Sequence, residues 1–208
     1  MPHMDVRAAR DHDQDQLQQL TEGAKRALRQ QLRGLRQALP EAAAAARSQR
    51  IVAQLSQHPR ILAARRVALF WPILDRREID LRPLDRLLRT RGATLYYPYM
   101  RTADAGDVET GFRVTASADD LVIFAQRFAQ PPTSAKTAER ADIDVVVVPA
   151  LAATVEGHRL GYGSGFYDAT LPDVCPPAYS IVVVHDFQLL LELPRELHDR
   201  ACDEVVTD

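Results

Sequence analysis

The sequence lacks the features that mark several common classes of protein. It has only two cysteines among 208 residues, with no Cys-x-x-Cys pair, so neither a disulfide framework nor a structural zinc site is expected. No apolar run approaches the roughly 18 residues of a membrane span, and the acidic, glutamine-rich start is unlike a signal or transit peptide. We therefore expect a cytoplasmic protein with no membrane partner.

An excess of charge of one sign is also missing. The chain has 26 Lys and Arg against 28 Asp and Glu, a formal net charge of -2, which gives no reason to expect a nucleic-acid partner. An RNA-binding function has no support either, since the chain has no RGG run and no surface pattern of aromatic and basic residues. The length fits one ordinary domain, and we favour a monomer.

Hydrophobic periodicity divides the chain into a polar start and an α/β domain. Residues 1–23 are polar and lack core residues, so we predict a disordered extension there and one domain over residues 24–208. Leucines at helical spacing after Ala24 predict a helix that Pro40 ends, and a second helix is expected over residues 41–57.

Helices and short apolar segments alternate in the rest of the chain. A helix is expected over residues 81–91, and the expected strands cover residues 66–70, 94–97, 144–148 and 180–184. Residues 103–140 show less pattern, although Phe112 fits a short strand. Apolar runs such as residues 145–148 suit strands buried on both faces. The alternation predicts an open, mostly parallel α/β sheet flanked by helices, in a three-layer, Rossmann-like arrangement.

The densest motif runs from Gly157 to Asp168, GHRLGYGSGFYD, and holds four of the nine glycines. Glycine lets backbone N–H groups converge on an anion, and a helix that begins after the loop would add its positive end. Arg159 can grip phosphate oxygens, and Asp168 can hold Mg²⁺. The spacing is neither that of the nucleoside-triphosphatase loop nor a clean GxGxxG. We predict a ligand-binding loop at the carboxyl edge of the sheet.

The first predicted helix also carries a basic face. Lys25, Arg29, Arg33 and Arg36 recur at steps of four, four and three residues, which places them on one side of the helix beside the leucines. Taken alone, such a face is most simply interpreted as solvated.

Four segments, in this order, resemble the 5-formyltetrahydrofolate cyclo-ligase family, whose members are also called methenyltetrahydrofolate synthetases. They are residues 25–29 (KRALR), 78–80 (EID), 145–168 (the apolar run with the glycine-rich loop) and 193–207 (LPRELHD and DEVVT). The glycine-rich loop is the most specific of the four. The resemblance covers about residues 24–208.

The resemblance implies an enzyme that uses ATP and Mg²⁺ to convert 5-formyltetrahydrofolate into 5,10-methenyltetrahydrofolate, ADP and phosphate through a phosphorylated formyl group. On the family pattern, Arg159 and Asp168 are catalytic, and Asp168 and Asp199 bind Mg²⁺. The implied ATP contacts are basic and loop residues: Lys25, Arg29, Arg159, Leu160, Gly161, Tyr162, Gly163, Ser164, Gly165, Phe166 and Tyr167. The implied folate contacts overlap with them: Glu78, Tyr162, Gly163, Ser164, Gly165 and Phe166. Arg33 and Arg36 stay assigned to solvent.

Several of these assignments have structural alternatives. Asp168 can cap the following helix, Asp199 can be a plain surface carboxylate, and Glu78 can complement a helix dipole. Trp71 and Tyr97, at the ends of predicted strands, fit either the folate pocket or the core. The alternative function is a noncatalytic nucleotide- or folate-binding module on the same fold.

The chain also departs from the family pattern on the folate side. The segment between Pro72 and Glu78 is longer than the pattern, so Glu78 can be displaced. Gln130-Pro131 stands where Glu-Pro is usual, and Ala153-Thr154 where Phe-Asp is usual. Ser164 replaces a common Gly or Lys. The ATP segments are intact.

Overall fold

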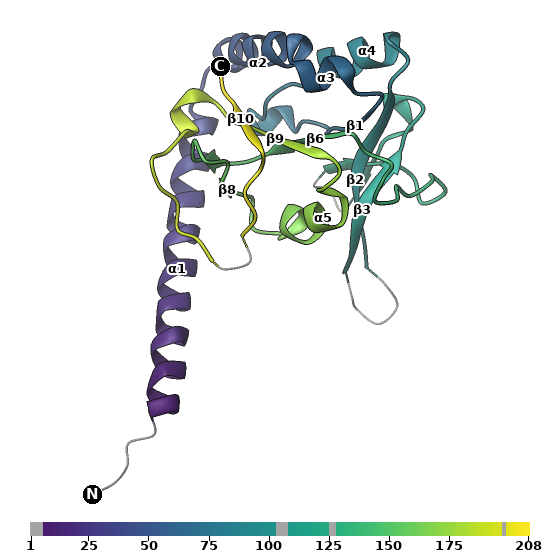
Figure 1. Ribbon diagram of the computed structural model, residues 1–208. Coiled ribbons are helices and arrows are strands. Elements are labelled where there is room, and N and C mark those ends of the chain that lie inside the picture. Colours follow the sequence, from purple (N-terminus) through teal and green to yellow (C-terminus); the bar gives the residue numbers. More distant parts are fainter. Residues whose placement is uncertain (1–5, 103–107, 125–127, 197–198) are drawn as a thin grey trace, which may run out of the picture.

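A six-stranded sheet runs through the molecule in the order β10-β9-β6-β1-β2-β3 (Figure 1). The computed structural model describes residues 6–102, 108–124, 128–196 and 199–208. The strands of the sheet are β1 (Arg66–Ala68), β2 (Thr94–Thr102), β3 (Val108–Val114), β6 (Val145–Pro149), β9 (Tyr179–Val183) and β10 (Glu204–Val206). Neighbouring strands are parallel except β2 and β3, which are antiparallel. The prediction of an open, mostly parallel sheet is confirmed.

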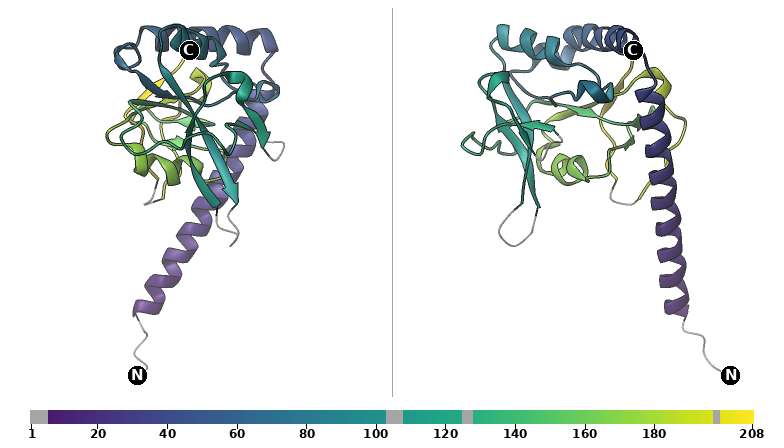
Figure 2. Two further views of the ribbon diagram at one scale, coloured as in Figure 1. Left: turned by 90° about the vertical axis from the view of Figure 1, so that its right-hand side faces the viewer. Right: turned by 180° about the vertical axis from the view of Figure 1, so that it is seen from behind.

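Helices cover both faces of this sheet. They are α2 (Glu41–Gln57), α3 (Pro59–Ala63), α4 (Arg82–Thr90) and α5 (Phe166–Val174). The first three lie over one face and α5 lies over the other (Figures 1 and 2). Because side chains alternate along a strand, β6 sends Val145 and Val147 into the core that includes α2 and α4, and Val146 and Val148 into the core that includes α5. This burial on both faces explains why the run is apolar throughout.

The predicted elements agree with the structure where the local signal is strong. Helix α2 has the predicted bounds, residues 41–57, and its Ile51 and Leu55 are both fully buried. Burial of such a side chain stabilises the fold by about 1.5–3 kcal/mol. Strand β2 is longer than the predicted residues 94–97, because Tyr96–Thr102 pair with the edge strand β3. Phe112 lies on β3, as expected.

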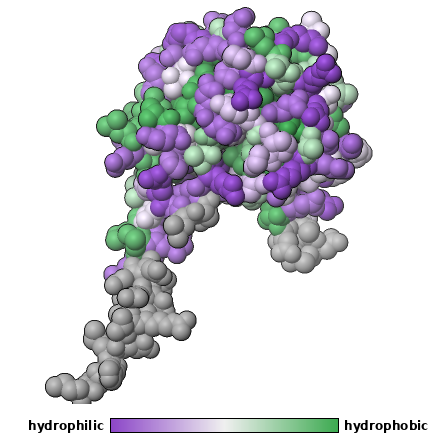
Figure 3. Space-filling model, viewed as in Figure 1, coloured by the Kyte–Doolittle hydropathy of each residue, from purple (hydrophilic) through white to green (hydrophobic). Residues whose placement is uncertain are grey.

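Strand β10 of the sheet was not predicted from the sequence. Shorter elements connect the strands and helices described above. Two hairpins pair β4 (Val122–Phe124) with β5 (Phe128–Gln130) and β7 (Ala152–Ala153) with β8 (Arg159–Leu160). The 3-10 turns are η1 (Leu74–Arg76), η2 (Ala118–Asp120) and η3 (Asp186–Gln188). None of the helices in the described ranges is long and apolar enough to cross a membrane. Hydrophilic and hydrophobic residues are interspersed on the described part of the face seen in Figure 3.

Helix α1 (Val6–Gln37) begins well before the predicted start near Ala24 and projects away from the domain (Figures 1 and 2). Residues 6–23, for which the sequence predicted disorder, are helical in the structure, and residues 1–5 lie outside the described ranges. Once the docked part is helical, each added residue gains a hydrogen bond without a new nucleation step. The predicted lack of core contacts agrees with the structure, since Leu17 and Leu20 are 66% and 71% exposed.

Deletion of residues 1–20 should change the Tm by no more than about 2 °C, because the exposed leucines of this segment bury little apolar surface. The matched control is Leu32→Ala on the docked part of α1, where the side chain is 2% exposed and its loss should cost about 2–5 kcal/mol. Thermal unfolding followed by circular dichroism measures both. A large fall in the Tm of the truncated chain would show that the projecting turns contribute to folding.

Candidate active site

A cavity of about 690 Å³ opens at the carboxyl ends of the central strands. Phe70 and Trp71 follow β1, Pro98 and Met100 belong to β2, and Pro149 ends β6, and all five line the cavity. The other lining residues come from α1, the segment before Glu78, β5 and the glycine-rich loop. Open α/β sheets bind ligands at this edge, where loops meet beyond the strand ends.

The glycine-rich loop connects β8 to α5 along one side of this cavity. Gly163, which lines the cavity, has φ 99°, a conformation that other residues rarely adopt. Gly165 is the N-cap of α5, so the unpaired N–H groups of the first turn lie beside the loop. Gly157 has a different role, because a Cβ there would approach the Cys202 carbonyl oxygen to 2.0 Å. The Leu160 side chain is also buried, in a cluster with Leu32 of α1.

Three arginines of α1 hold this loop. Arg29 Nε donates to the Gly161 carbonyl at 3.0 Å, and Arg33 Nη2 donates to the Tyr162 carbonyl at 2.7 Å. Arg36 Nη1 donates to the Tyr162 hydroxyl at 2.6 Å. The assignment of Arg36 to solvent was wrong, since this residue is 4% exposed and lines the cavity with the exposed Arg33.

The sequence did contain a signal for Arg36. It follows the buried Leu32 by four residues, which places both side chains on the same face of α1. A polar residue in line with a buried leucine points to a polar contact within the fold, rather than to solvent.

Glu78 lies at the inner wall of the cavity, 8% exposed. Its Oε2 accepts a hydrogen bond from Ile73 N at 2.9 Å, and its Oε1 lies 3.9 Å from Arg36 Nη2. Burial raises the pKa of Glu78 above its usual value, against the opposing effects of the Ile73 N–H and Arg36. Its alternative role at a helix start was wrong, because α4 begins only at Arg82.

The longer segment before Glu78 does not remove this carboxylate from the cavity. The segment forms the 3-10 turn η1, after which Arg77 turns the chain back with φ 54°. The other departure that the structure explains is Gln130, whose side-chain oxygen accepts a hydrogen bond from Met100 N at 2.9 Å. A glutamate oxygen could accept the same bond.

Arg159 and Asp168 form an ion pair next to the glycine-rich loop. Arg159 Nη2 lies 2.5 Å from Asp168 Oδ1, and Arg159 Nη1 donates to the Arg200 carbonyl at 2.5 Å. Asp168 is in the first turn of α5 behind the N-cap Gly165, so the interpretation of Asp168 as the cap was wrong. The Arg159 side chain is 3% exposed and that of Asp168 is 35% exposed, so the carboxylate faces outward.

Lys25 pairs with the second predicted metal ligand. Its Nζ lies 2.7 Å from Asp199 Oδ2 and 2.5 Å from Glu196 Oε2. Burial alone would lower the pKa of Lys25, but the hydrogen bonds with Asp199 and Glu196 outweigh it and hold that pKa above its usual value. Asp199 is therefore no plain surface carboxylate. The carbonyl of its neighbour Arg200 accepts a hydrogen bond from Arg159, which also pairs with Asp168.

The donors in this region suit Mg²⁺ held jointly with phosphates. Within the described ranges, no group of three or more His, Cys, Asp or Glu residues could hold a metal by itself. Mg²⁺ commonly takes only one or two carboxylates and completes its shell with phosphate oxygens and water. Asp168 and Asp199 fit that requirement.

Aromatic residues divide between the cavity and the core. Trp71 lines the cavity, whereas Tyr97 is fully buried and hydrogen-bonds to Asp85, so it belongs to the core. Burial raises the pKa of the Tyr162 and Tyr167 hydroxyls, which are therefore neutral donors. The buried Tyr167 hydroxyl has no hydrogen-bond partner in the described part of the chain, and its residue lines the cavity. An unpaired buried hydroxyl at a cavity is available to hydrogen-bond to a ligand.

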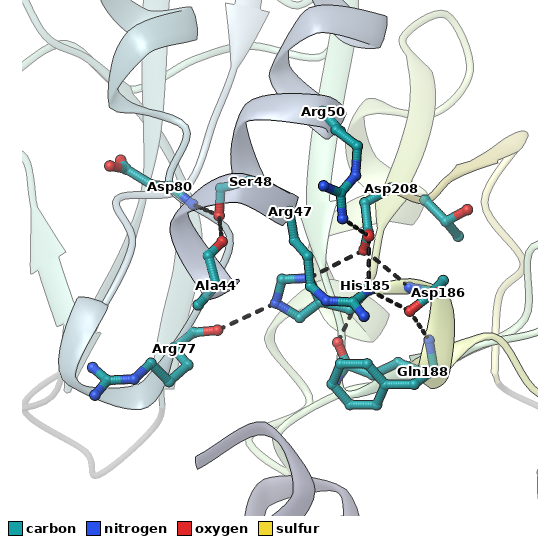
Figure 4. A network of polar contacts seen from close by, with 12 residues as sticks. Ala44, Arg47, Ser48, Arg50, Arg77, Asp80, His185, Asp186, Gln188 and Asp208 are labelled. Carbon is teal, nitrogen blue, oxygen red and sulfur yellow. Dashed lines mark hydrogen bonds and ion pairs between the residues drawn. The ribbon is translucent and has the colours of Figure 1, made fainter. Parts of the chain in front are cut away.

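A polar network around His185 contacts the segment that precedes Glu78 (Figure 4). His185 is fully buried, with Nε2 3.5 Å from the Arg77 carbonyl and Nδ1 3.5 Å from Asp208 Oδ1. Asp208 Oδ2 accepts hydrogen bonds from Arg47 and Arg50 of α2 at 2.7 and 2.8 Å. The network thus ties the segment before Glu78 to α2 and to residue 208.

A sheet of this kind, with a glycine-rich loop and buried cations at its carboxyl edge, is typical of enzymes that bind phosphorylated ligands. Residues 21–208 match the model of the 5-formyltetrahydrofolate cyclo-ligase family. The chain therefore belongs to the 5-formyltetrahydrofolate cyclo-ligase family. The predictions of the family and of its ligase class are confirmed.

Individual relatives agree with this assignment. The chain is 29% identical over 165 residues to the 5-formyltetrahydrofolate cyclo-ligase of Escherichia coli K12, covering 76% of this chain and 86% of that protein. It is 47% identical over 79 residues to the enzyme of the same name from Mycolicibacterium smegmatis, covering 38% of this chain and only 41% of the relative.

A solved structure also resembles the chain. The 5,10-methenyltetrahydrofolate synthetase of Aquifex aeolicus superposes with a TM-score of 0.74 at 28% identity, covering 88% of this chain and 89% of that one. The synthetase of Mycoplasma pneumoniae shares the fold, with a TM-score of 0.66 at 21% identity over 87% of this chain and 96% of that one.

The stability of the protein should fall as the pH drops below about 6.5, in part through His185. Burial lowers the pKa of His185 below its usual value, against the opposing effects of the Arg77 carbonyl and Asp208. The folded state then binds fewer protons than the unfolded state, so this contribution is complete above the unfolded pKa and is lost as the pH falls. The Tm measured between pH 8 and 5.5 tests this.

The variant that isolates this effect is His185→Gln, which keeps a polar side chain but cannot titrate. Its Tm should depend less on pH over this interval than that of the wild type. His158→Gln, which removes a half-buried imidazole that contacts Arg195, is the matched control. If the Tm of His185→Gln depends on pH as strongly as that of the wild type, His185 does not contribute to the pH dependence of stability.

Proposed function

We propose that the chain catalyses the cyclisation of 5-formyltetrahydrofolate to 5,10-methenyltetrahydrofolate, consuming ATP in the presence of Mg²⁺ and releasing ADP and phosphate. The observation that carries this proposal is that a buried carboxylate and a glycine-rich loop share one cavity. Glu78 lies at one wall, and residues 162–164 and 166–167 lie at the other. The loop can thus contact a heterocycle inside the cavity and a nucleotide on its other side, where Lys25, Arg29 and Arg159 lie outside the cavity lining.

The proposed ATP half consists of the loop and the cations behind it. Lys25, Arg29 and Arg159 would neutralise the triphosphate, together with the N–H groups at the start of α5. Without phosphates, Arg159 pairs with Asp168 and Lys25 with Asp199 and Glu196. Phosphate oxygens can replace these carboxylates on the cations, which leaves Asp168 and Asp199 free to hold Mg²⁺. The ion supplies charge neutralisation at the phosphates.

The proposed folate half combines an acid with apolar walls. The pterin ring offers N–H donors, and Glu78 is an acceptor at the inner end of the cavity. Phe70, Trp71 and Met100 supply apolar surface for the aromatic part of the substrate. We assign Tyr162, Gly163, Ser164, Gly165 and Phe166 to both substrates, because this loop separates the two halves.

The chemistry requires activation of a poor leaving group. The formyl oxygen attacks the γ-phosphorus of ATP, the bond from that phosphorus to the bridging oxygen breaks, and ADP leaves. The resulting iminium phosphate is attacked at carbon by N10, which loses its proton, and the carbon–oxygen bond breaks to release phosphate. Phosphoryl transfer depends mainly on positioning and on stabilisation of charge, which Arg159 and the loop can provide.

The purified chain should form 5,10-methenyltetrahydrofolate from 5-formyltetrahydrofolate only when ATP and Mg²⁺ are both present, with one ADP released per product. The measurement follows product absorbance and ADP in the same reaction. Reactions that lack ATP, Mg²⁺ or the folate are the controls. Tight binding of ATP without product from any formyl folate would instead support a noncatalytic nucleotide- or folate-binding module.

Substitutions in the two halves should separate the two substrates. Glu78→Gln should raise the KM for the folate by roughly tenfold to a hundredfold, because a charge-assisted hydrogen bond is worth about 1.5–3 kcal/mol. It should change the KM for ATP less. Asp168→Asn should instead raise the Mg²⁺ concentration needed for half-maximal rate by about tenfold, since hard cations favour charged oxygen ligands.

Each of these variants has a control at a nearby exposed carboxylate. Asp75→Asn changes an exposed carboxylate in η1, and Asp173→Asn changes an exposed carboxylate in α5. Both should behave as the wild type. Equal effects of Glu78→Gln on both substrates would contradict the folate assignment, and an unchanged Mg²⁺ titration in folded Asp168→Asn would remove Asp168 from the metal site.

A further inference from the structure

The residues that line the cavity carry more positive than negative charge. Three arginines line it, Arg33, Arg36 and Arg76, against one carboxylate, Glu78, so the lining charges sum to +2 when all four are ionised. Arg36 is buried beside Glu78 and Tyr162. Arg33 and Arg76 are exposed, and neither forms a hydrogen bond or ion pair with a carboxylate among the described residues. The charge of Arg76 reaches Glu78 only from a distance, where it acts against the rise that burial causes in the pKa of that carboxyl. The excess charge therefore lies at the rim of the cavity.

Arg76 lies in the segment before Glu78 and lines the cavity. It is the last residue of η1, and its side chain makes no hydrogen bond or ion pair within the described ranges. Gln37 of α1 donates from Nε2 to the Asp75 carbonyl at 3.1 Å, which holds this turn against the helix that carries Arg33. Arg33 uses Nη2 for the Tyr162 carbonyl, a neutral partner that leaves its charge uncompensated.

The lining thus has an order from the inside outward. Glu78 is buried at the inner end, apolar side chains such as Phe70 and Met100 form the walls, and exposed Arg33 and Arg76 stand at the rim. A ligand that fits this order has hydrogen-bond donors at one end, an aromatic middle and an anionic end.

We infer that Arg33 and Arg76 bind the glutamyl carboxylates of the folate substrate, and so determine specificity for the anionic end of that molecule. This inference rests on the proposed function. The competing ligand for the two arginines is the triphosphate. The cations proposed for the triphosphate, Lys25, Arg29 and Arg159, do not line this cavity, so the rim arginines belong to the folate half.

The test compares two substrates that differ only at this end, 5-formyltetrahydrofolate and 5-formyltetrahydropteroate, which has no glutamate. The wild type should prefer the folate by about tenfold in kcat/KM, since an exposed ion pair is worth up to about 1 kcal/mol, or about fivefold, for each arginine. Arg76→Gln should lower this preference about three- to fivefold, and Arg33→Gln with Arg76→Gln should abolish it. Added salt should reduce the preference of the wild type and not that of the double variant.

Arg65→Gln, at the opposite end of β1, is the matched control and should keep the wild-type preference. The single tryptophan, Trp71, lines the cavity, so its fluorescence gives the Kd for each ligand even without turnover. If the protein shows no turnover but still binds 5-formyltetrahydrofolate with a lower Kd than 5-formyltetrahydropteroate, the proposed function is overturned. The role of Arg33 and Arg76 in binding the glutamyl carboxylates is then supported. Three results for Arg76→Gln would overturn the inference that Arg33 and Arg76 bind the glutamyl carboxylates. They are an equal loss of affinity for both ligands, an unchanged preference for the folate, and a raised KM for ATP alone.

Discussion

The contact between α1 and the glycine-rich loop is the interaction on which the site depends. Glycines give this loop conformational freedom, so it needs partners that fix its shape. Arg29, Arg33 and Arg36 provide them by donating hydrogen bonds to the carbonyls of Gly161 and Tyr162 and to the Tyr162 hydroxyl. Hydrogen bonds from charged donors are worth about 1.5–3 kcal/mol, enough together to favour one loop conformation. The same helix borders the cavity through Arg33 and Arg36.

The ion pairs beside the loop share one design. Two of the three cations that we assign to ATP, Arg159 and Lys25, are each paired with a carboxylate that we assign to Mg²⁺, Asp168 and Asp199 respectively. A buried cation without a partner would be costly, so these pairs keep the site stable when no nucleotide is bound. A ligand that brings phosphates and a divalent cation together can replace both members of each pair. The phosphates would then pair with Arg159 and Lys25, and the divalent cation with Asp168 and Asp199.

The sequence predicted those parts of the fold whose signal is local. Helix α2 has the predicted bounds because a regular apolar face lies between two prolines, and β6 is recognisable because every residue of its run is buried. The three residues of β10 are too few to show a pattern. The sequence also did not reveal that α1 extends to Val6, since that part of the helix buries no described leucine.

The sequence by itself determined the family, the α/β fold and the residue types that the proposed chemistry needs, because motif spacing and hydrophobic periodicity are properties of the chain. Only the tertiary structure decided what each polar residue contacts. Arg36 and Arg33 lie on the same helix, yet one is buried beside Glu78 and the other is at the rim. Helical periodicity shows which residues share a face. It does not show what that face meets, because the surface of the loop and of η1 comes from segments far away in the sequence.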